Sequence, residues 1–214
     1  MKRWLKILSL LLLAVACKRP GHKQQLPFYN TPNFTPVWLS PTDKGYADIH
    51  TIAPFGFTNQ FGKTITNRDT REKIYVANFF FTSCPAICPR MMSNLAAVQL
   101  AFGNNNRVLI LSHSVTPLKD SVPVLRKYAE DHGINGKSWY LLTGNQDAIY
   151  KLARRAYFAD DATGFNRGTD EFLHTENLVL IDGKGRIRGV YNSTLVLEVQ
   201  NLITHIRLLL VEKG

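Results

Sequence analysis

Cysteine is scarce in this chain of 214 residues, which has only Cys17, Cys84 and Cys88. Long apolar runs are scarce too: the stretch 7–16 is shorter than the roughly 18 residues needed to cross a bilayer, and no later segment comes closer. Internal repeats and low-complexity tracts are absent. With 45% hydrophobic and 20% charged residues, the composition excludes a disordered tail, a collagen-like rod and a coiled coil. It indicates one globular domain.

Acidic residues are fewer than basic ones, 16 against 26, which gives a net charge of +10. Lys2, Arg3 and Lys6 lie in the amino-terminal leader, so +7 remains on the rest of the chain. These remaining basic residues are scattered and often stand beside acids, as in Arg68-Asp69. We interpret them as a solvated surface and expect no nucleic-acid partner.

The first 16 residues have the layout of a secretory signal peptide, with positive residues ahead of a short apolar run. The sequence LAVAC over residues 13–17 resembles a bacterial lipobox, in which the cysteine becomes the lipidated first residue of the mature chain. An ordinary A-x-A cleavage site fits the same residues. We expect an exported lipoprotein that faces the periplasm and is held at the membrane through Cys17. Cys84 and Cys88 then remain as one pair in a compartment that permits disulfides.

Residues 18–41 are polar and rich in proline, without a sustained apolar period, which predicts an extended tether. We expect a lipid-anchored flexible tether over residues 17–45 and a single folded domain over residues 46–214. At the start of the domain, residues 55–58 and 64–66 predict a β-hairpin in which Gly62 helps the chain to turn.

Strand and helix patterns alternate after this hairpin. Residues 74–82 (IYVANFFFT) form a nearly continuous apolar run, which predicts a central strand buried on both faces. The other predicted strands are 108–111, 139–142, 177–181 and 186–191, and the predicted helices are 89–102, 121–132, 145–158 and 195–211. This order predicts an α/β fold, with a thioredoxin-like mixed sheet flanked by helices and extended by the amino-terminal β-hairpin.

Cys84 and Cys88 lie between the first central strand and its helix, in the sequence CPAICP over residues 84–89. A helix amino terminus stabilises a thiolate, so cysteines placed there are more acidic and better ligands than usual. A spacing of four brings the two Cα atoms to about 6 Å, which permits either a disulfide or a shared metal ion. The common thiol oxidoreductase motif has two intervening residues. Three leave room for a soft cation, and Cu(I) is the natural candidate because thiolates favour it.

A third ligand would come from one of six histidines, namely His22, His50, His113, His132, His174 and His205. His174 is the candidate because it directly precedes the strand predicted over 177–181. In a thioredoxin-like topology the loop entering that strand faces the cysteine loop, at the place where thioredoxins have a cis-proline. We therefore predict His174 as a ligand, with loop packing as the alternative. For His113, at the end of a strand, a structural role is favoured over one in an outer shell of the site.

The sequence FFFTSCPAICP over residues 79–89, with His174 downstream, resembles the Sco/SenC family of copper-binding proteins that assist assembly of cytochrome c oxidase. The resemblance covers about residues 50–212 and implies one copper ion bound by Cys84, Cys88 and His174. It also implies a copper-accepting subunit of cytochrome c oxidase as the partner. Where the family commonly has D-P-x-x-D-T, this chain has TPLKDS over residues 116–121. Thr116 replaces the first acid and Asp120 keeps the second.

Other functions remain open from the residues themselves. A thiol–disulfide oxidoreductase acting on an exported or membrane protein would use Cys84 and Cys88 as attacking and resolving thiols, with a thiol reductant as partner. A peroxide-reducing protein has thin support, in Thr82 alone. A structural disulfide would close a short loop and add little stability. Met91 and Met92 are adjacent helix positions that point different ways, so we expect core packing for at least one.

Overall fold

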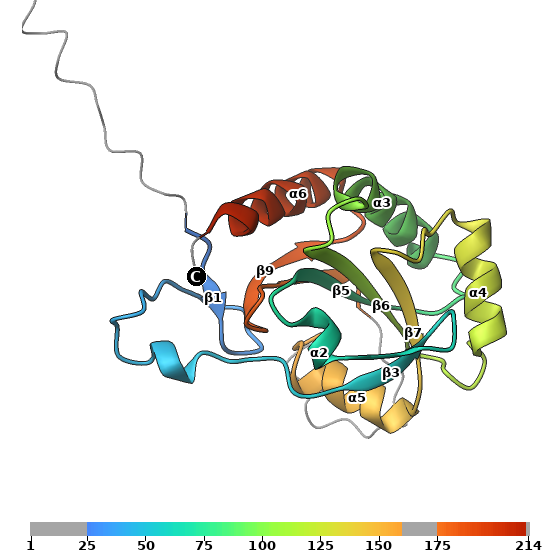
Figure 1. Ribbon diagram of the computed structural model, residues 1–214, viewed down its shortest axis with the longest axis horizontal. Helices are drawn as coiled ribbons and strands as arrows, with labels where there is room; N and C mark the ends of the chain where they lie inside the picture. Colours follow the sequence, from blue (N-terminus) through green and yellow to red (C-terminus); the bar gives the residue numbers. More distant parts are fainter. Residues whose placement is uncertain (1–24, 160–174, 213–214) are drawn as a thin grey trace, which may run out of the picture.

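The computed structural model describes residues 25–159 and 175–212, which build a seven-stranded sheet in the order β4-β3-β7-β6-β5-β8-β9 (Figure 1). The strands are β3 (Gly56–Asn59), β4 (Thr64–Thr66), β5 (Ile74–Phe80), β6 (Val108–Ser114), β7 (Trp139–Thr143), β8 (Asn177–Ile181) and β9 (Ile187–Asn192). Neighbours among β5, β6 and β7 are parallel, and the other pairs are antiparallel. The predicted mixed sheet and the predicted hairpin, β3–β4 with Gly62 at a φ of 78°, are confirmed.

Helices cover both faces of this sheet (Figure 1). They are α2 (Asn67–Thr70), α3 (Ile87–Phe102), α4 (Val122–Asp131), α5 (Gln146–Arg155) and α6 (Val196–Val211). Buried side chains of α3, α4 and α6 share one core with one face of the sheet, and those of α5 share a second core with the other face. Within the described ranges, no helix has the length and apolarity needed to cross a bilayer.

Strand β5 is the centre of both cores, because all seven of its residues are buried. Val76 and Phe80 pack with the α3 and α6 side, whereas Ala77 and Phe79 pack with the α5 side. A strand buried on both faces needs apolar residues at consecutive positions, which explains the unbroken run in the sequence. Burial on this scale fixes the end of β5, and therefore the point from which the cysteine loop leaves the sheet.

The edge of the sheet at the end of β5 gathers three chain segments. Phe80 at the end of β5 pairs with Ser114 at the end of β6, so the loops that follow both strands leave from the same edge. Strand β8 is antiparallel to β5 and pairs Val179 with Ala77, so it begins at this edge. Loops far apart in the sequence therefore meet there.

Helix α3 begins at Ile87, two residues before the predicted start at Pro89. Proline is tolerated in a first turn because its missing N–H would have no intrahelical partner there. Cys88 consequently lies in the first turn of α3 and Cys84 in the loop that leads to it. Met91 and Met92 are both buried in the core, as expected for at least one of them.

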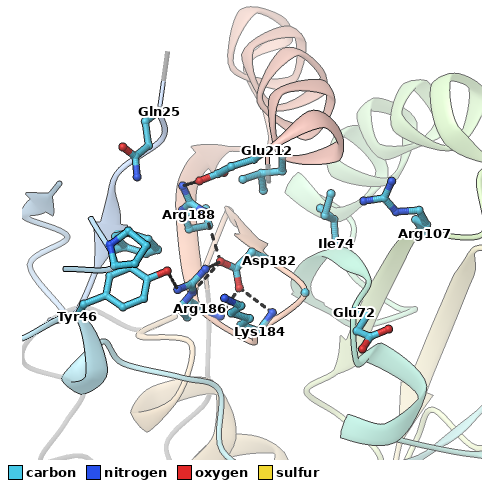
Figure 2. Close-up of a pocket in the computed structure, with 14 residues that line it drawn as sticks. Gln25, Tyr46, Glu72, Ile74, Arg107, Asp182, Lys184, Arg186, Arg188 and Glu212 are labelled. Atoms are coloured by element: carbon cyan, nitrogen blue, oxygen red, sulfur yellow. Dashed lines mark hydrogen bonds and ion pairs between the residues drawn. The ribbon is translucent and has the colours of Figure 1, made fainter. Parts of the chain in front are cut away.

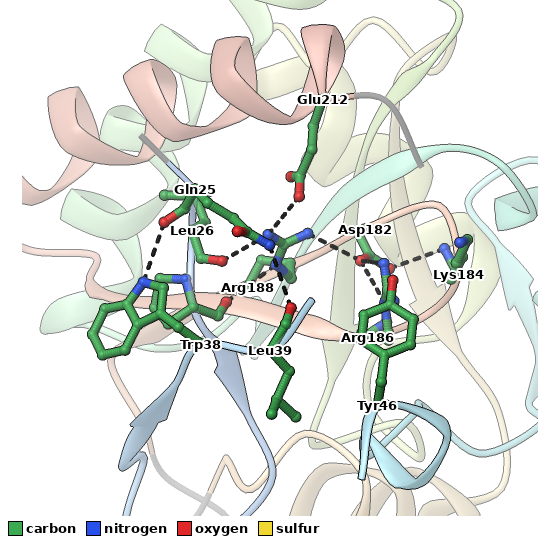
Figure 3. Close-up of polar contacts among 11 residues, drawn as sticks. Gln25, Leu26, Trp38, Leu39, Tyr46, Asp182, Lys184, Arg186, Arg188 and Glu212 are labelled. Atoms are coloured by element: carbon green, nitrogen blue, oxygen red, sulfur yellow. Dashed lines mark hydrogen bonds and ion pairs between the residues drawn. The ribbon is translucent and has the colours of Figure 1, made fainter. Parts of the chain in front are cut away.

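The described part of the expected tether is packed on the domain, which differs from the extended segment that its composition predicts. Leu26 and Phe28 are buried, and Phe28–Tyr29 (β1) pairs with Pro36–Val37 (β2) in a small separate sheet. The Arg188 guanidinium donates to the backbone oxygens of Leu26 at 2.7 Å and Pro27 at 3.1 Å (Figure 3). Strands of two residues carry too little pattern to be recognised in a sequence, and an arginine 161 residues from Pro27 gives no local signal. Residues 25–29 thus belong to the folded domain.

Arg188 and Arg186 line a cavity of about 270 Å³ beside this segment (Figure 2). Both arginines pair with the buried Asp182, Arg186 at 2.8 Å and Arg188 at 3.3 Å. The Arg186 guanidinium also donates to the Tyr46 hydroxyl at 2.8 Å. Tyr46 begins the short 3-10 helix η2 (Tyr46–Asp48), so this network holds a second point of the amino-terminal segment against the sheet.

Candidate metal centre

Cys84 and Cys88 come together at the start of α3 as free, buried thiols. Cys84 is 8% exposed and Cys88 is 3% exposed, and a side-chain hydrogen bond joins the two thiols. A turn at the Cys84 backbone, whose N–H donates to the Phe81 carbonyl oxygen at 3.2 Å, holds the loop close to the end of β5. Ser83, Pro85 and Ala86 around the pair are exposed. The two sulfurs therefore lie just below the surface, within reach of a ligand or of another protein.

The Cys84 thiol is the more acidic of the pair. Burial alone would raise its pKa, but hydrogen bonds from the backbone N–H groups of Cys88, Ala86 and Ile87 and from the Cys88 side chain outweigh this and lower the pKa. These N–H groups belong to the beginning of α3, where helical N–H groups have no intrahelical partner. Cys84 is therefore poised to act as a thiolate, either as a nucleophile or as a soft ligand.

The Cys88 thiol behaves in the opposite way. Burial raises its pKa to about 12, and interactions with Cys84 and the Asp120 carboxylate add to the increase despite a hydrogen bond from the Phe81 backbone. Tyr128 of α4 lies in the same environment, because the pKa of its hydroxyl is raised by burial and by the charges of Cys88, Cys84 and Asp120. Cys88 therefore stays protonated near neutral pH until a cation or a neighbouring sulfur replaces its proton.

Asp120 is a fully buried carboxylate in the loop that leaves β6, and it ties this loop to the cysteine loop. Its oxygens accept from the Thr82 hydroxyl at 2.5 Å and the Thr82 backbone N–H at 3.3 Å. They also accept from the hydroxyls of Ser114 at 2.6 Å and Thr116 at 3.0 Å. The Thr82 hydroxyl, which gave thin support to a peroxide-reducing site, is thus engaged by Asp120.

The four histidines in the described part of the chain contact groups other than the two cysteines. The rings of His50, His132 and His205 lie 2.8, 2.8 and 2.7 Å from the Ala156 carbonyl, the Tyr128 carbonyl and the Tyr191 hydroxyl, respectively. His113 is buried among aromatic rings in the core on the α5 side, whereas Cys84 and Cys88 belong to the core on the α3 side. The structural role favoured for His113 therefore fits its position.

His174, the predicted third ligand, and Cys17, the predicted lipid attachment site, lie outside the described residues, as does His22. Strand β8 begins at Asn177, and the Asn177 N–H is held by the Thr175 hydroxyl at 3.2 Å. Within residues 25–159 and 175–212, no three His, Cys, Asp or Glu side chains gather in a way that could hold a metal ion. Cys84 and Cys88 are therefore the candidate ligands in the described part of the site.

Sequence reasoning identified both cysteines but gave little weight to Asp120, Thr82 and Tyr128, which surround them. Each lies on a different chain segment: Thr82 follows β5, Asp120 follows β6 and Tyr128 lies on α4. A partial signal was present for Asp120, since it is the acid that remains of the D-P-x-x-D-T pattern. No local pattern marked Tyr128, because its position near the sulfurs depends on how α4 packs beside the end of β5.

Comparison with known protein families gives one clear match. The family model described as SCO1/SenC matches residues 44–210 of this chain. The SCO1 protein homolog of Bacillus subtilis is 28% identical over 158 residues, an alignment that covers 73% of this chain and 81% of that protein.

Solved structures agree with this match. BsSco, described as a member of the Sco family of cytochrome c oxidase assembly proteins with a disulfide switch, superposes with a TM-score of 0.64 at 25% identity, covering 77% of this chain and 96% of BsSco. A SCO1/SenC family lipoprotein from Bacillus anthracis superposes with a TM-score of 0.65 at 27% identity, covering 75% of this chain and 95% of that protein. ScoI of Bradyrhizobium japonicum, solved with copper bound, shares the fold with a TM-score of 0.57 at 21% identity, with 74% and 99% covered.

Proposed function

Because the chain belongs to the SCO1/SenC family, we propose that it is a copper chaperone that carries one copper ion on Cys84, Cys88 and His174. The ion is cargo, which the protein delivers to the copper-accepting subunit of cytochrome c oxidase during assembly. Copper bound to relatives such as ScoI supports this choice of cargo. Thiolate sulfur and imidazole nitrogen are the donors that copper prefers in proteins.

The contact between the Cys84 and Cys88 thiols at the start of α3 is the observation that carries this proposal. Two thiols that already interact with each other are placed to share a metal ion without rearrangement of the backbone. Binding copper as thiolates releases the thiol protons, which is most costly for Cys88 because burial raises its pKa to about 12. The backbone N–H groups at the start of α3 stabilise negative charge on Cys84 and lower this cost.

The register of β8 supports His174 as the third ligand. Strand β8 starts at Asn177, opposite the end of β5 from which the cysteine loop leaves. A chain of three residues spans at most about 10 Å, so His174 has the reach to approach the cysteine loop. Exposure of Ser83, Pro85 and Ala86 leaves the sulfurs accessible to ligands of a recipient protein. Copper can then pass through intermediates in which both proteins share it.

Copper titration of the purified chain tests the three-ligand site. We expect one copper ion per chain and, for Cys84→Ser or Cys88→Ser, a loss of Cu(I) affinity beyond the roughly 100-fold effect typical of an outer-shell partner. His174→Ala should weaken Cu(II) binding and change the visible and electron paramagnetic resonance spectra, because an imidazole ligand is lost. His50→Ala is the matched control, since the His50 ring is hydrogen-bonded to the Ala156 carbonyl after α5, on the other side of the sheet from the cysteines. Unchanged spectra in His174→Ala would contradict the proposal.

A thiol–disulfide oxidoreductase is the second candidate, favoured by the opposite pKa shifts of the two thiols. The Cys84 thiolate would attack a client disulfide and release one client sulfur as a thiolate. Cys88 would then attack the Cys84 sulfur, releasing the second client thiol and leaving a Cys84–Cys88 disulfide for a thiol reductant to reduce. Rapid turnover of a model disulfide by both wild type and His174→Ala, without copper binding, would favour this candidate over the chaperone.

We also propose that the chain is exported and held at the membrane, facing the periplasm, through a lipid on Cys17. The leader pattern supports this, as does the description of the Bacillus anthracis relative as a lipoprotein. Mass spectrometry of the mature amino terminus should find a diacylated Cys17. An unmodified residue at that position, or a retained leader, would contradict the anchor.

A further inference from the structure

The strongest unexplained feature beside the site is a buried charge. Asp120 is fully buried and accepts hydrogen bonds from four donors: the hydroxyls of Thr82, Ser114 and Thr116, and the Thr82 backbone N–H. The Ser114 oxygen itself accepts from the Thr116 backbone N–H at 3.1 Å, so its own proton is directed at Asp120. Together these four donors solvate a carboxylate at this buried position.

No counter-charge is paired with this carboxylate among the residues that the structure describes. The described ion pairs involve Asp131, Asp182 and Glu212, and none includes Asp120. Neutral hydroxyl groups solvate the charge but do not cancel it. Asp120 therefore remains a source of negative potential in the interior, where the effective dielectric constant is lower than in water.

The Asp120 carboxylate lies close to the cysteine loop, because it accepts from the hydroxyl and the backbone N–H of Thr82, two residues before Cys84. Its charge contributes to raising the pKa of the Cys88 thiol and that of the Tyr128 hydroxyl on the neighbouring helix. A negative charge that disfavours a thiolate at this position equally favours a cation there. The interaction grows with the charge of the cation, so a divalent ion gains about twice as much as a monovalent one at the same position.

We propose that Asp120 determines how the site discriminates between the oxidation states of copper: its fixed negative charge favours Cu(II) relative to Cu(I). This inference rests on the proposed function, because it needs copper on Cys84 and Cys88. Soft thiolates favour Cu(I), and Asp120 opposes that preference, which keeps both states of the cargo within the range that the site can hold. Asp120 touches neither sulfur through a hydrogen bond recorded among the described residues, so it acts as a specificity-determining residue and not as a ligand.

Thr116 adds a neutral donor to this arrangement. An acid at this position would place a second negative charge beside Asp120. Here the Thr116 hydroxyl instead donates to Asp120 at 3.0 Å. The site is therefore tuned by one buried carboxylate, and removing that single charge should have a clear effect.

The test compares the association constants of Cu(II) and Cu(I) in the full chain under anaerobic conditions, by competition with chelators of known affinity. Asp120→Asn should lower the Cu(II)/Cu(I) ratio about 10- to 100-fold, as expected for removing one charge at an effective dielectric constant near 20. Each tenfold change corresponds to about 59 mV in the potential of the bound copper, in the positive direction. Asp120→Ser, which leaves room for water among the three hydroxyls, is a second charge-removing variant in case the amide disturbs folding.

Two variants separate the charge from other effects. Asp131→Asn removes a carboxylate from an exposed position at the end of α4, where solvent screens the charge, so the Cu(II)/Cu(I) ratio of this variant should stay within about threefold of wild type. Thr116→Val keeps the Asp120 charge and removes one hydrogen-bond donor, so its ratio should change much less than that of Asp120→Asn. Equal shifts in Thr116→Val and Asp120→Asn, or no shift in either charge-removing variant, would overturn the inference.

Failure of this inference is distinguishable from failure of the proposed function. Wild-type binding of one copper ion that depends on Cys84, with an unchanged ratio in Asp120→Asn and Asp120→Ser, would leave the chaperone proposal intact and remove the role of Asp120. Absence of copper binding in the wild type would overturn both.

Discussion

Replacing Arg188 by methionine should lower the free energy of unfolding by about 2–4 kcal/mol, because it removes a buried cation from a network with several partners. The Arg188 side chain is 1% exposed and pairs with Asp182 at 3.3 Å and Glu212 at 3.0 Å (Figure 3). It is also the donor for the backbone oxygens of Leu26 and Pro27. Arg186 remains paired with Asp182 in the variant, which keeps the expected loss below that of a fully orphaned carboxylate.

Urea denaturation of the full chain measures this effect, and limited proteolysis locates it. The variant should be cleaved faster between residues 25 and 45, because the carbonyl groups of Leu26 and Pro27 lose the cation that holds them. Arg107→Met is the matched control: Arg107 lines the same cavity but is exposed, and substitution there should change stability by no more than about 0.5 kcal/mol (Figure 2). Equal stability of the two variants would show that Arg188 does not hold the amino-terminal segment.

His113 should make the protein lose stability as the pH falls from about 6.5 towards 3. The ring is fully buried among Phe55, Phe57, Phe79 and Tyr157, and neither ring nitrogen has a hydrogen-bond partner within the described structure. Burial lowers the pKa of His113 to about 3, because the charged imidazolium would have no solvation there. An unfolded chain, in contrast, protonates its histidine near the ordinary value of about 6.5.

The direction of this pH effect depends on whether the folded or the unfolded state binds more protons. Between about pH 3 and 6.5 the unfolded state binds the His113 proton and the folded state does not, so acid favours unfolding. Above about pH 6.5 the histidine is neutral in both states, and the folded protein has its full stability. Between about pH 6.5 and 3 the free energy of unfolding falls by at most about 1.4 kcal/mol for each pH unit. In His113→Leu the free energy of unfolding should therefore depend less on pH, and the slope should decrease by the roughly 1.4 kcal/mol per pH unit that one bound proton contributes.

Urea denaturation at pH 4.5, 5.5 and 7.5 measures this slope, which is independent of any change in packing that the substitution causes. His132→Gln is the control, because it also replaces a histidine but at an exposed position outside the aromatic cluster around His113. A slope in His113→Leu equal to that of wild type would mean that the ring is solvated or paired in the folded protein.

Local sequence patterns predicted much of the architecture because burial imposes itself on consecutive residues. The run over 74–82 contains β5, and the helical spacing predicted over 89–102 lies within α3. Element ends were less accurate: α3 starts at Ile87 and not at Pro89, since proline within a first turn does not reveal how many residues precede it. The amino-terminal strands were missed because two residues are too few to show a period.

The sequence by itself determined that two cysteines, spaced by four, stand between a buried strand and a helix, because strand burial and helix starts are local properties of the chain. Only the tertiary structure decided what surrounds them. Asp120 and Tyr128 approach the sulfurs because β6 lies parallel to β5 and α4 packs beside them, and Arg188 reaches Leu26 because the two ends of the domain meet. Such contacts join residues that are distant in sequence, and the charges, burial and hydrogen bonds that tune the site exist only after the chain has folded.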